Sequence, residues 1–276
     1  MLLRAGRSLL DNLEVLIGKR DRLTPPRRLV QGTGGDFKQG GEEFFRHFLQ
    51  LGELKPNARV LDVGCGCGRM ALPLTRYLSA EGGYWGFDIV KENIAWCQKN
   101  LGAKHRNFHF VLADVRNKNY HPKGKYKAAE YRFPYQDAFF DFVSLTSVFT
   151  HLLPADMQNY LREITRVLKP TGRSLITFFL LNEESRDLLS RGLGNLKFPF
   201  AGQDCMLARQ DFPEAAVAFE ESFIRRDYEA RGLEIIEPIR YGIWCGRKQG
   251  LSYQDLVVAS KRKGDAGVKT GSETNG

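Results

Sequence analysis

The segment VLDVGCGCGR, residues 60–69, joins an apolar run typical of a buried strand to a turn with glycine at positions 64, 66 and 68. Glycines between a strand and a helix adopt dihedrals that other residues resist, and they let the backbone approach a ligand closely. A dinucleotide fingerprint spaced G-x-G-x-x-G requires glycine at position 69, where this chain has arginine. The segment therefore predicts a nucleotide-cofactor loop that departs from the dinucleotide pattern.

Outward from this loop, strand and helix signals alternate, a pattern that builds a parallel sheet covered on both faces. The predicted strands are residues 59–63, 84–88, 108–113, 140–146, 174–181, 233–236 and 255–260. The predicted helices are residues 44–51, 70–78, 94–97, 157–168 and 213–231. We expect a doubly wound, Rossmann-like α/β fold with helices on both faces of a mostly parallel sheet.

The composition excludes several classes of protein. With 276 residues, 42% hydrophobic and 26% charged, the chain is globular rather than disordered or fibrous. No apolar run approaches the roughly 18 residues that a membrane-spanning helix needs. The five cysteines are odd in number and lack paired metal-ligand spacing, so we expect reduced thiols, no metal site and a cytoplasmic protein. The net charge of +9 favours anionic partners without identifying one.

Three segments flank or interrupt the alternating region. An amphipathic helix is predicted over residues 2–17, and its acidic residues favour packing on the core or over a cleft rather than on a membrane surface. The glycine-rich residues 32–41 form either a linker or a loop that covers a ligand. Residues 182–213 show no clear period and are predicted to be a lid or insertion. The resulting division is an N-terminal helix with its glycine-rich loop over 1–40, one domain over 41–262, and a disordered tail over 263–276.

Acidic residues end the first three predicted strands. Asp62, two residues before the first glycine, suits the ammonium group of a ligand better than a pyrophosphate, which it would repel. Asp88 is placed to accept hydrogen bonds from both hydroxyls of a ribose, and Asp114 to accept one from an adenine amino group. Each acid alone is equally explained as a helix cap or a solvated strand end. Because parallel strands end at one edge of a sheet, the three together with the glycine loop predict a single crevice for a ligand that is cationic at one end.

Residues 60–69, with Asp88, Asp114 and the later RVLKPTGR at 166–173, resemble the class I S-adenosylmethionine-dependent methyltransferases. The resemblance covers residues 55–181 and extends to bacterial small-molecule members through Trp244 to Arg247. It implies a seven-stranded sheet whose last strand is antiparallel, with S-adenosylmethionine lying over the first two strands.

By the same resemblance, the glycines flank the amino-acid part of the cofactor, while the three acids bind its amino group, ribose and adenine in chain order. Asp36-Phe37 is also similar to a segment that covers the cofactor in some members. The expected cofactor-binding residues are Asp62, Gly64, Cys65, Gly66, Gly68, Asp88, Ile89, Asp114, Val115 and Thr146.

The acceptor site is expected at residues 146–151, directly after the fourth strand. A methyltransferase chiefly aligns its acceptor with the bond that breaks, and a base is needed only for some acceptors. Histidine titrates near neutral pH, so His151 is the candidate base. The alternative, which we weigh more heavily, is that His151 begins the next helix with its imidazole bonded to the backbone.

The predicted function is methyl transfer to a small molecule. The chain lacks the Asn-Pro-Pro-Tyr-like segment and the Pro-Cys pair of enzymes that methylate nucleic-acid bases. An RNA or polyanion substrate remains the second hypothesis, because cations and aromatic residues interleave over residues 116–135. The simpler explanation for that segment is a solvated loop whose aromatic rings pack onto the core. A third hypothesis is a non-catalytic partner that binds the cofactor.

Overall fold

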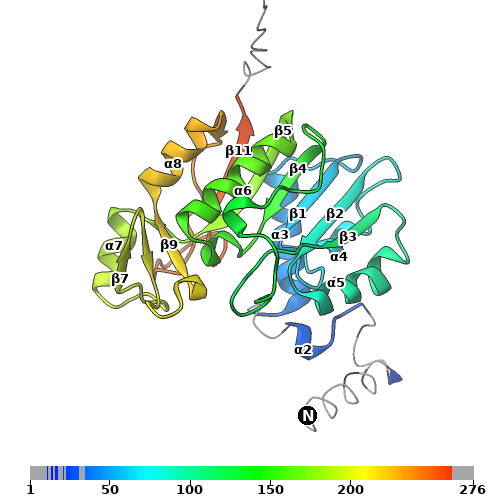
Figure 1. Cartoon of the computed structure of the whole chain (residues 1–276), viewed down its shortest axis with the longest axis horizontal. Helices are drawn as coiled ribbons and strands as arrows, with labels where there is room; N and C mark the ends of the chain where they lie inside the picture. The colour runs from blue at the N-terminus through cyan, green and yellow to red at the C-terminus, as the bar shows by residue number, and fades with distance from the viewer. Residues whose placement is uncertain are drawn as a thin grey trace, which may run out of the picture.

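The computed structural model describes residues 11, 14, 16–17, 21, 23–30 and 35–262. Most of the predicted N-terminal helix, positions 32–34 of the glycine-rich segment and the predicted tail lie outside the described residues. The described chain forms a large central sheet with helices on both sides and a small second sheet at one flank (Figure 1).

The central sheet has seven strands in the order β10-β11-β5-β4-β1-β2-β3. Strand β11 is antiparallel to both of its neighbours, and the pairs among β1 to β5 are parallel. The bounds are β1 Arg59–Val63, β2 Gly83–Asp88, β3 Phe108–Leu112, β4 Phe140–Leu145, β5 Leu168–Phe178, β10 Leu233–Ile235 and β11 Asp255–Lys261. The doubly wound, mostly parallel sheet expected from the sequence is confirmed.

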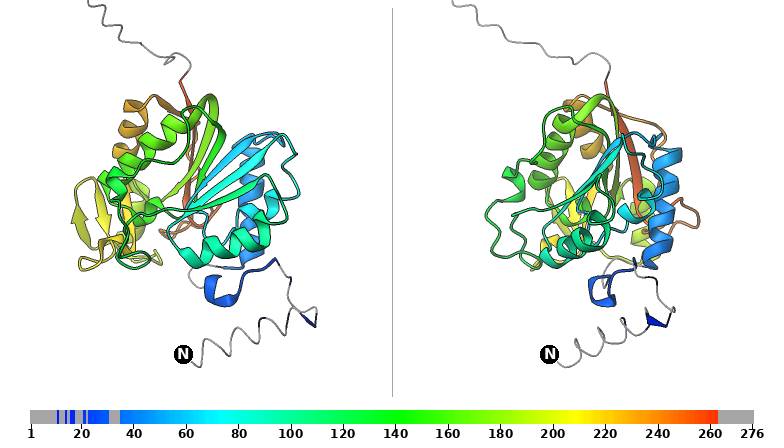
Figure 2. Two further views of the ribbon diagram at one scale, coloured as in Figure 1. Left: turned by 45° about the vertical axis from the view of Figure 1, so that its right-hand side comes forward. Right: turned by 90° about the vertical axis from the view of Figure 1, so that its right-hand side faces the viewer.

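The helices cover both faces of this sheet (Figure 2). On one face lie α3 (Phe37–Gln50), α4 (Ala71–Leu74) and α5 (Lys91–Cys97), which continues as a π-helix over Gln98–Gly102. On the other face lie α6 (Pro154–Val167) and α8 (Glu221–Ala230), packed in a separate apolar cluster. A short helix, α2 (Arg27–Val30), precedes α3. No helix in the described part of the chain is both long and apolar enough to cross a membrane.

Two helix boundaries differ from the sequence expectation. Helix α3 begins at Phe37, because the Asp36 side chain accepts a hydrogen bond from Gln39 N at 2.8 Å and caps it. Gly41 is therefore helical rather than part of a loop, and a Cβ there would lie 2.6 Å from the carbonyl oxygen of Arg69. The helix predicted over residues 70–78 is reduced to α4, with turns on either side. Gly41 thus serves close packing of α3 against the residues after the glycine loop.

The structure differs from the sequence expectation in the first part of residues 213–231, and residues 182–213 contain regular secondary structure. The predicted lid contains α7 (Glu183–Ser190), and a second sheet is formed by β6 (Leu180–Leu181), β9 (Val217–Glu220), β8 (Cys205–Leu207) and β7 (Phe200–Gly202), in that order. The predicted helix over 213–231 is a strand in its first part, with α8 beginning at Glu221. The small sheet has its own apolar cluster around Trp244 and Phe179. Strands of two to four residues are too short to show a period of two in sequence, which explains the error.

Candidate active site

A cavity of about 310 Å³ opens at the carboxyl edge of the central sheet. Its wall combines the loop after β1 with the residues that follow β2, β3 and β4. Of the residues predicted from sequence, it is lined by Asp62, Gly64, Cys65, Gly66, Asp88, Ile89, Val115, Thr146 and His151. Gly68 and Asp114 are not among its lining residues.

The three glycines of the loop all have positive φ, at 76° for Gly64, 53° for Gly66 and 81° for Gly68. This conformation costs other L-residues roughly 1–2 kcal/mol, which explains the repeated glycine. A Cβ on Gly64 would lie 2.3 Å from Val148 Cγ2, and one on Gly68 would lie 2.7 Å from Leu101 Cδ1. A Cβ on Gly66 would meet no described atom within 4 Å. Gly68 is therefore a packing residue, whereas Gly66 leaves its side-chain space open to the cavity.

Asp62 is buried at the end of β1. Its carboxylate accepts hydrogen bonds from Tyr84 Oη at 2.5 Å and Ser144 Oγ at 3.2 Å. Burial raises the pKa of Asp62 to about 6, although these two bonds oppose the shift. The side chain is thus ionised at pH 7 and presents a negative charge to the cavity.

A cation lies at the same end of the cavity. Arg69 lines it, and the arginine charge acts on Asp62 to lower the carboxyl pKa. Burial in turn lowers the pKa of Arg69. A carboxylate and a guanidinium that line one cavity complement the ammonium and carboxylate of an amino-acid moiety. From the sequence, Arg69 was used to exclude the dinucleotide pattern and was not predicted to bind a ligand.

Asp88 fastens the glycine loop. Its Oδ2 accepts a hydrogen bond from Gly66 N at 2.9 Å, and its Oδ1 accepts one from Val90 N at 2.8 Å. Burial raises the pKa of Asp88 more than these bonds lower it. Each carboxylate oxygen keeps a further lone pair for a ligand hydroxyl, so the predicted ribose contact is compatible with this arrangement.

Asp114 does not join the other two acids in the cavity. Its side chain is 53% exposed and accepts hydrogen bonds from His121 Nε2 at 2.9 Å and Lys125 N at 3.1 Å. The bond to His121 holds the pKa of Asp114 below its usual range. Because β3 ends at Leu112, the chain has already turned into the next loop at this position. Asp114 closes that loop, and its neighbour Val115 lines the cavity instead.

His151 lies in a 3-10 turn (Phe149–His151) and lines the cavity. Its Nδ1 is 2.9 Å from the carbonyl oxygen of Glu214, in the 3-10 turn between β8 and β9 of the second sheet. A carbonyl only accepts hydrogen bonds, so Nδ1 carries the proton and Nε2 of the neutral ring keeps its lone pair. The backbone bond expected for a structural histidine is present, and it also sets the tautomer that a base requires.

Other lining residues were not named individually from the sequence, although Ser147 lies within the acceptor site expected at residues 146–151. Ser147 lies in the left-handed region at φ 57°, with its Oγ donating to Gln254 Oε1 at 3.0 Å. Non-glycine residues in this conformation cluster at functional sites, but no sequence pattern predicts which residue will adopt it. Arg116, Asn117 and Tyr120 also line the cavity, from the basic and aromatic segment that the sequence did single out. Further along that segment, Tyr131 and Phe133 are buried in the core as the simpler explanation required.

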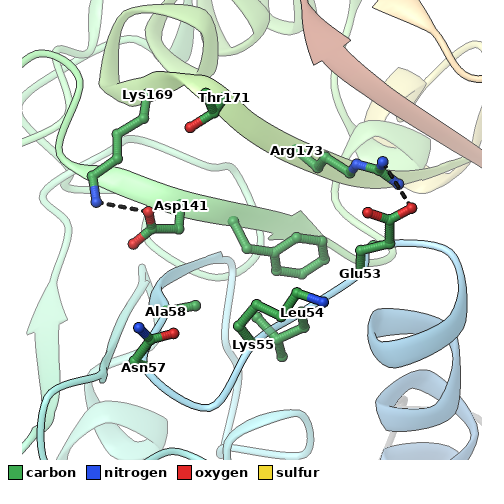
Figure 3. Close-up of a pocket in the computed structure, with 11 residues that line it drawn as sticks. Glu53, Leu54, Lys55, Asn57, Ala58, Asp141, Lys169, Thr171 and Arg173 are labelled. Atoms are coloured by element: carbon green, nitrogen blue, oxygen red, sulfur yellow. Dashed lines mark hydrogen bonds and ion pairs between the residues drawn. The ribbon is translucent and has the colours of Figure 1, made fainter.

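A second cavity, of about 340 Å³, lies at the opposite edge of the sheet, where β1, β4 and β5 begin. Two ion pairs flank it, Lys169 with Asp141 and Arg173 with Glu53 (Figure 3). None of the predicted site residues lines it. Within the described residues, no three side chains of metal-ligating type are grouped to hold a metal ion.

Comparisons with known proteins agree with this geometry. Residues 61–176 match a family model described as a methyltransferase domain. A demethylmenaquinone methyltransferase of Staphylococcus haemolyticus is 27% identical over 127 residues, which is 46% of this chain and 46% of that protein. The chain thus matches about half the length of this curated relative.

Solved structures show the same fold. A Pyrococcus horikoshii protein matches with a TM-score of 0.56 at 17% identity, covering 82% of this chain and 91% of that one. A Methanosarcina mazei structure titled as a SAM-dependent methyltransferase has a TM-score of 0.51 at 22% identity, covering 75% of this chain and 94% of that one. At these identities the likeness concerns the fold alone.

Proposed function

We propose that the chain, whose residues 61–176 match a methyltransferase-domain model, is a class I S-adenosylmethionine-dependent methyltransferase that methylates a small-molecule acceptor by in-line displacement. The observation that carries the proposal is that His151 lines the same cavity as the glycine loop. The demethylmenaquinone methyltransferase relative supports a small acceptor.

The cavity suits the cofactor. Its volume of about 310 Å³ lies within the usual range for small-molecule sites, about 300–1,000 Å³. Asp62 and Arg69 would hold the ammonium and carboxylate of the methionine part, and Asp88 the ribose hydroxyls. Gly66, which would put a Cβ into open space, would let the backbone approach the cofactor. When bound, S-adenosylmethionine supplies a methyl group activated by a positive sulfur.

His151 would remove the acceptor proton. The carbonyl of Glu214 holds Nδ1 and so orients the ring with Nε2 as the proton-accepting atom. Ser147, which also lines the cavity, would contribute a hydroxyl to the acceptor side. Through the bond between His151 and the carbonyl of Glu214, which lies between β8 and β9, the small sheet would influence acceptor specificity.

The test is transfer of a radiolabelled methyl group from S-adenosylmethionine to acceptors in a metabolite extract, followed by the same assay on His151→Gln and His151→Ala. We expect label on a small molecule, kcat reduced about 10²- to 10⁴-fold in both variants, and cofactor affinity within twofold of the wild type. Label confined to macromolecules, or full kcat in both variants, would contradict the proposal.

A polyanion such as RNA is the second candidate acceptor. It is favoured by the position of Arg116 and Tyr120 at the cavity and by the exposure of Tyr126 nearby, since cations beside aromatic rings bind single strands. Substrate affinity that falls steeply with salt would support it, because bound phosphates release counterions. A flat salt response favours the small molecule.

A further inference from the structure

Four large apolar side chains are exposed together outside the active site. They are Leu193 at 47%, Ile243 at 41%, Leu251 at 47% and Tyr253 at 39% exposure, and we call them the apolar patch. Residues 243–244 pair with 252–253 through Ile243 N to Ser252 O and Trp244 N to Tyr253 O. A Cβ on Gly250 would lie 2.9 Å from Ile243 Cγ2, and a Cβ on Gly246 would lie 2.7 Å from Leu193 Cβ. These contacts place the segments that carry the four residues next to one another.

The patch rests on a rigid base. Trp244 is fully buried beneath it, and its Nε1 donates to Asp255 Oδ2 at 2.8 Å. The ring of Phe179 packs on Trp244 at 5.0 Å and on Tyr253 at 6.3 Å between centroids. Asp255 Oδ1 also accepts a hydrogen bond from Gly242 N at 2.7 Å, which fixes the backbone just before Ile243. The exposed side chains are therefore held outward by structure rather than left on a loose loop.

The patch lies at the same edge of the molecule as the cofactor cavity. Strand β11 is antiparallel to β5, and its first residue, Asp255, pairs with Phe178 at the end of β5. The residues just before Asp255 consequently emerge at the carboxyl edge of the sheet. Gln254 bonds to Ser147 in the cavity wall, and Ser252 Oγ donates to Glu43 Oε1 on α3 at 2.6 Å. Figure 2 shows this orange-red segment projecting beside the blue helix α3.

Cations accompany the apolar side chains. Lys248 lies between Ile243 and Leu251 in the chain, and Lys197 precedes Phe198, whose ring packs on Trp244 at 5.7 Å. Both lysines are exposed, and neither forms an ion pair within the described residues. The acidic Glu184 and Asp187 of the neighbouring α7 are paired with Arg247 and Arg191. Lys197 and Lys248 thus add positive charge next to the apolar patch.

We propose that the apolar patch, with Lys197 and Lys248, docks this edge of the enzyme onto an anionic lipid bilayer. Leucine and isoleucine side chains gain free energy by entering the acyl boundary, tyrosine favours the headgroup level, and lysines attract anionic lipids. A nucleic acid would satisfy the lysines but would leave Leu193, Ile243 and Leu251 in water. Docking here would place the cavity mouth near the bilayer surface.

The test is cosedimentation of the full chain with vesicles of phosphatidylcholine, with and without phosphatidylserine. We expect binding to the mixed vesicles that is at least tenfold weaker for Leu251→Asp and for Ile243→Asp, and about threefold weaker for Lys248→Gln. Val111→Asp is the matched control, because Val111 is 38% exposed on β3, the edge strand at the far end of the sheet from β11. It should bind like the wild type, and thermal melts should show all four variants folded.

Three results would overturn the proposal. The first is absence of vesicle binding by the wild type. The second is equal loss of binding in Val111→Asp, which would make the attraction non-specific. The third is a wild-type dimer, seen by light scattering, that Leu251→Asp dissociates while vesicles remain unbound, which would make the patch an interface between copies. None of these readouts requires methyl transfer, so the proposed function is tested separately.

Discussion

Replacing Asp88 by alanine tests whether the cofactor is held as the cavity suggests. The substitution removes the carboxylate that would accept the ribose hydroxyls, and it also frees the amides of Gly66 and Val90, bonded at 2.9 and 2.8 Å. We expect weaker cofactor binding for two reasons, a lost ligand contact and a loosened glycine loop.

The magnitude follows from the type of bond that is lost. A hydrogen bond to a charged group contributes about 1.5–3 kcal/mol, which corresponds to a roughly 10- to 150-fold rise in Kd. Titration calorimetry with S-adenosylmethionine and with its demethylated product measures this directly. Thermal unfolding of the free protein should also show lower stability, because two backbone amides lose their acceptor.

Asp114→Ala is the matched control, because the sequence pattern suggests a cofactor role for both acids, whereas in the structure only Asp88 lines the cavity. The Asp114 carboxylate faces His121 and Lys125 and lies outside the cavity wall. Its removal should change the Kd for cofactor by less than about threefold. An unchanged affinity in Asp88→Ala, or an equal loss of affinity in Asp114→Ala, would refute this role of Asp88.

Asp62 and the glycines of the loop provide two further predictions. The pKa of Asp62 is about 6 in the folded chain, against the usual 3.8, so the folded state binds more protons than the unfolded state between these pH values. As pH rises from 3.8 to 6, Asp62 therefore lowers the free energy of unfolding by up to about 3 kcal/mol. Asp62→Asn should therefore be more stable than the wild type at pH 8 but not at pH 4, with weaker cofactor binding; equal denaturant midpoint shifts at both pH values would refute this. Gly66→Ala should reduce cofactor affinity more than stability, whereas Gly64→Ala, whose Cβ meets Val148, should mainly reduce stability; calorimetry and urea unfolding of the pair distinguish the two, and identical profiles would count against an open Gly66.

Short segments of the sequence were sufficient to predict the central sheet. Strands β1 to β4 and the glycine loop were predicted to within one or two residues, because alternation of apolar runs and turn glycines is a property of short segments. The same segments supplied Asp62, Asp88 and His151 as candidate site residues. Parallel strands that end at one edge then bring these side chains together in any sheet of this topology.

Long-range contacts decided the rest. The direction of Asp114 depends on its bond to His121 across a folded loop, and the tautomer of His151 depends on a carbonyl 63 residues away. Strands β6 to β9 contain two to four residues each, and their buried side chains pack partly around Phe179 and Trp244 and partly in the main core cluster. The sequence alone specifies the cofactor-binding edge of the sheet, because the glycine loop and the strand ends that form it are recognisable in short segments. The acceptor side of the cavity and the apolar patch form only when distant segments pack together, because no single segment contains both partners of their contacts.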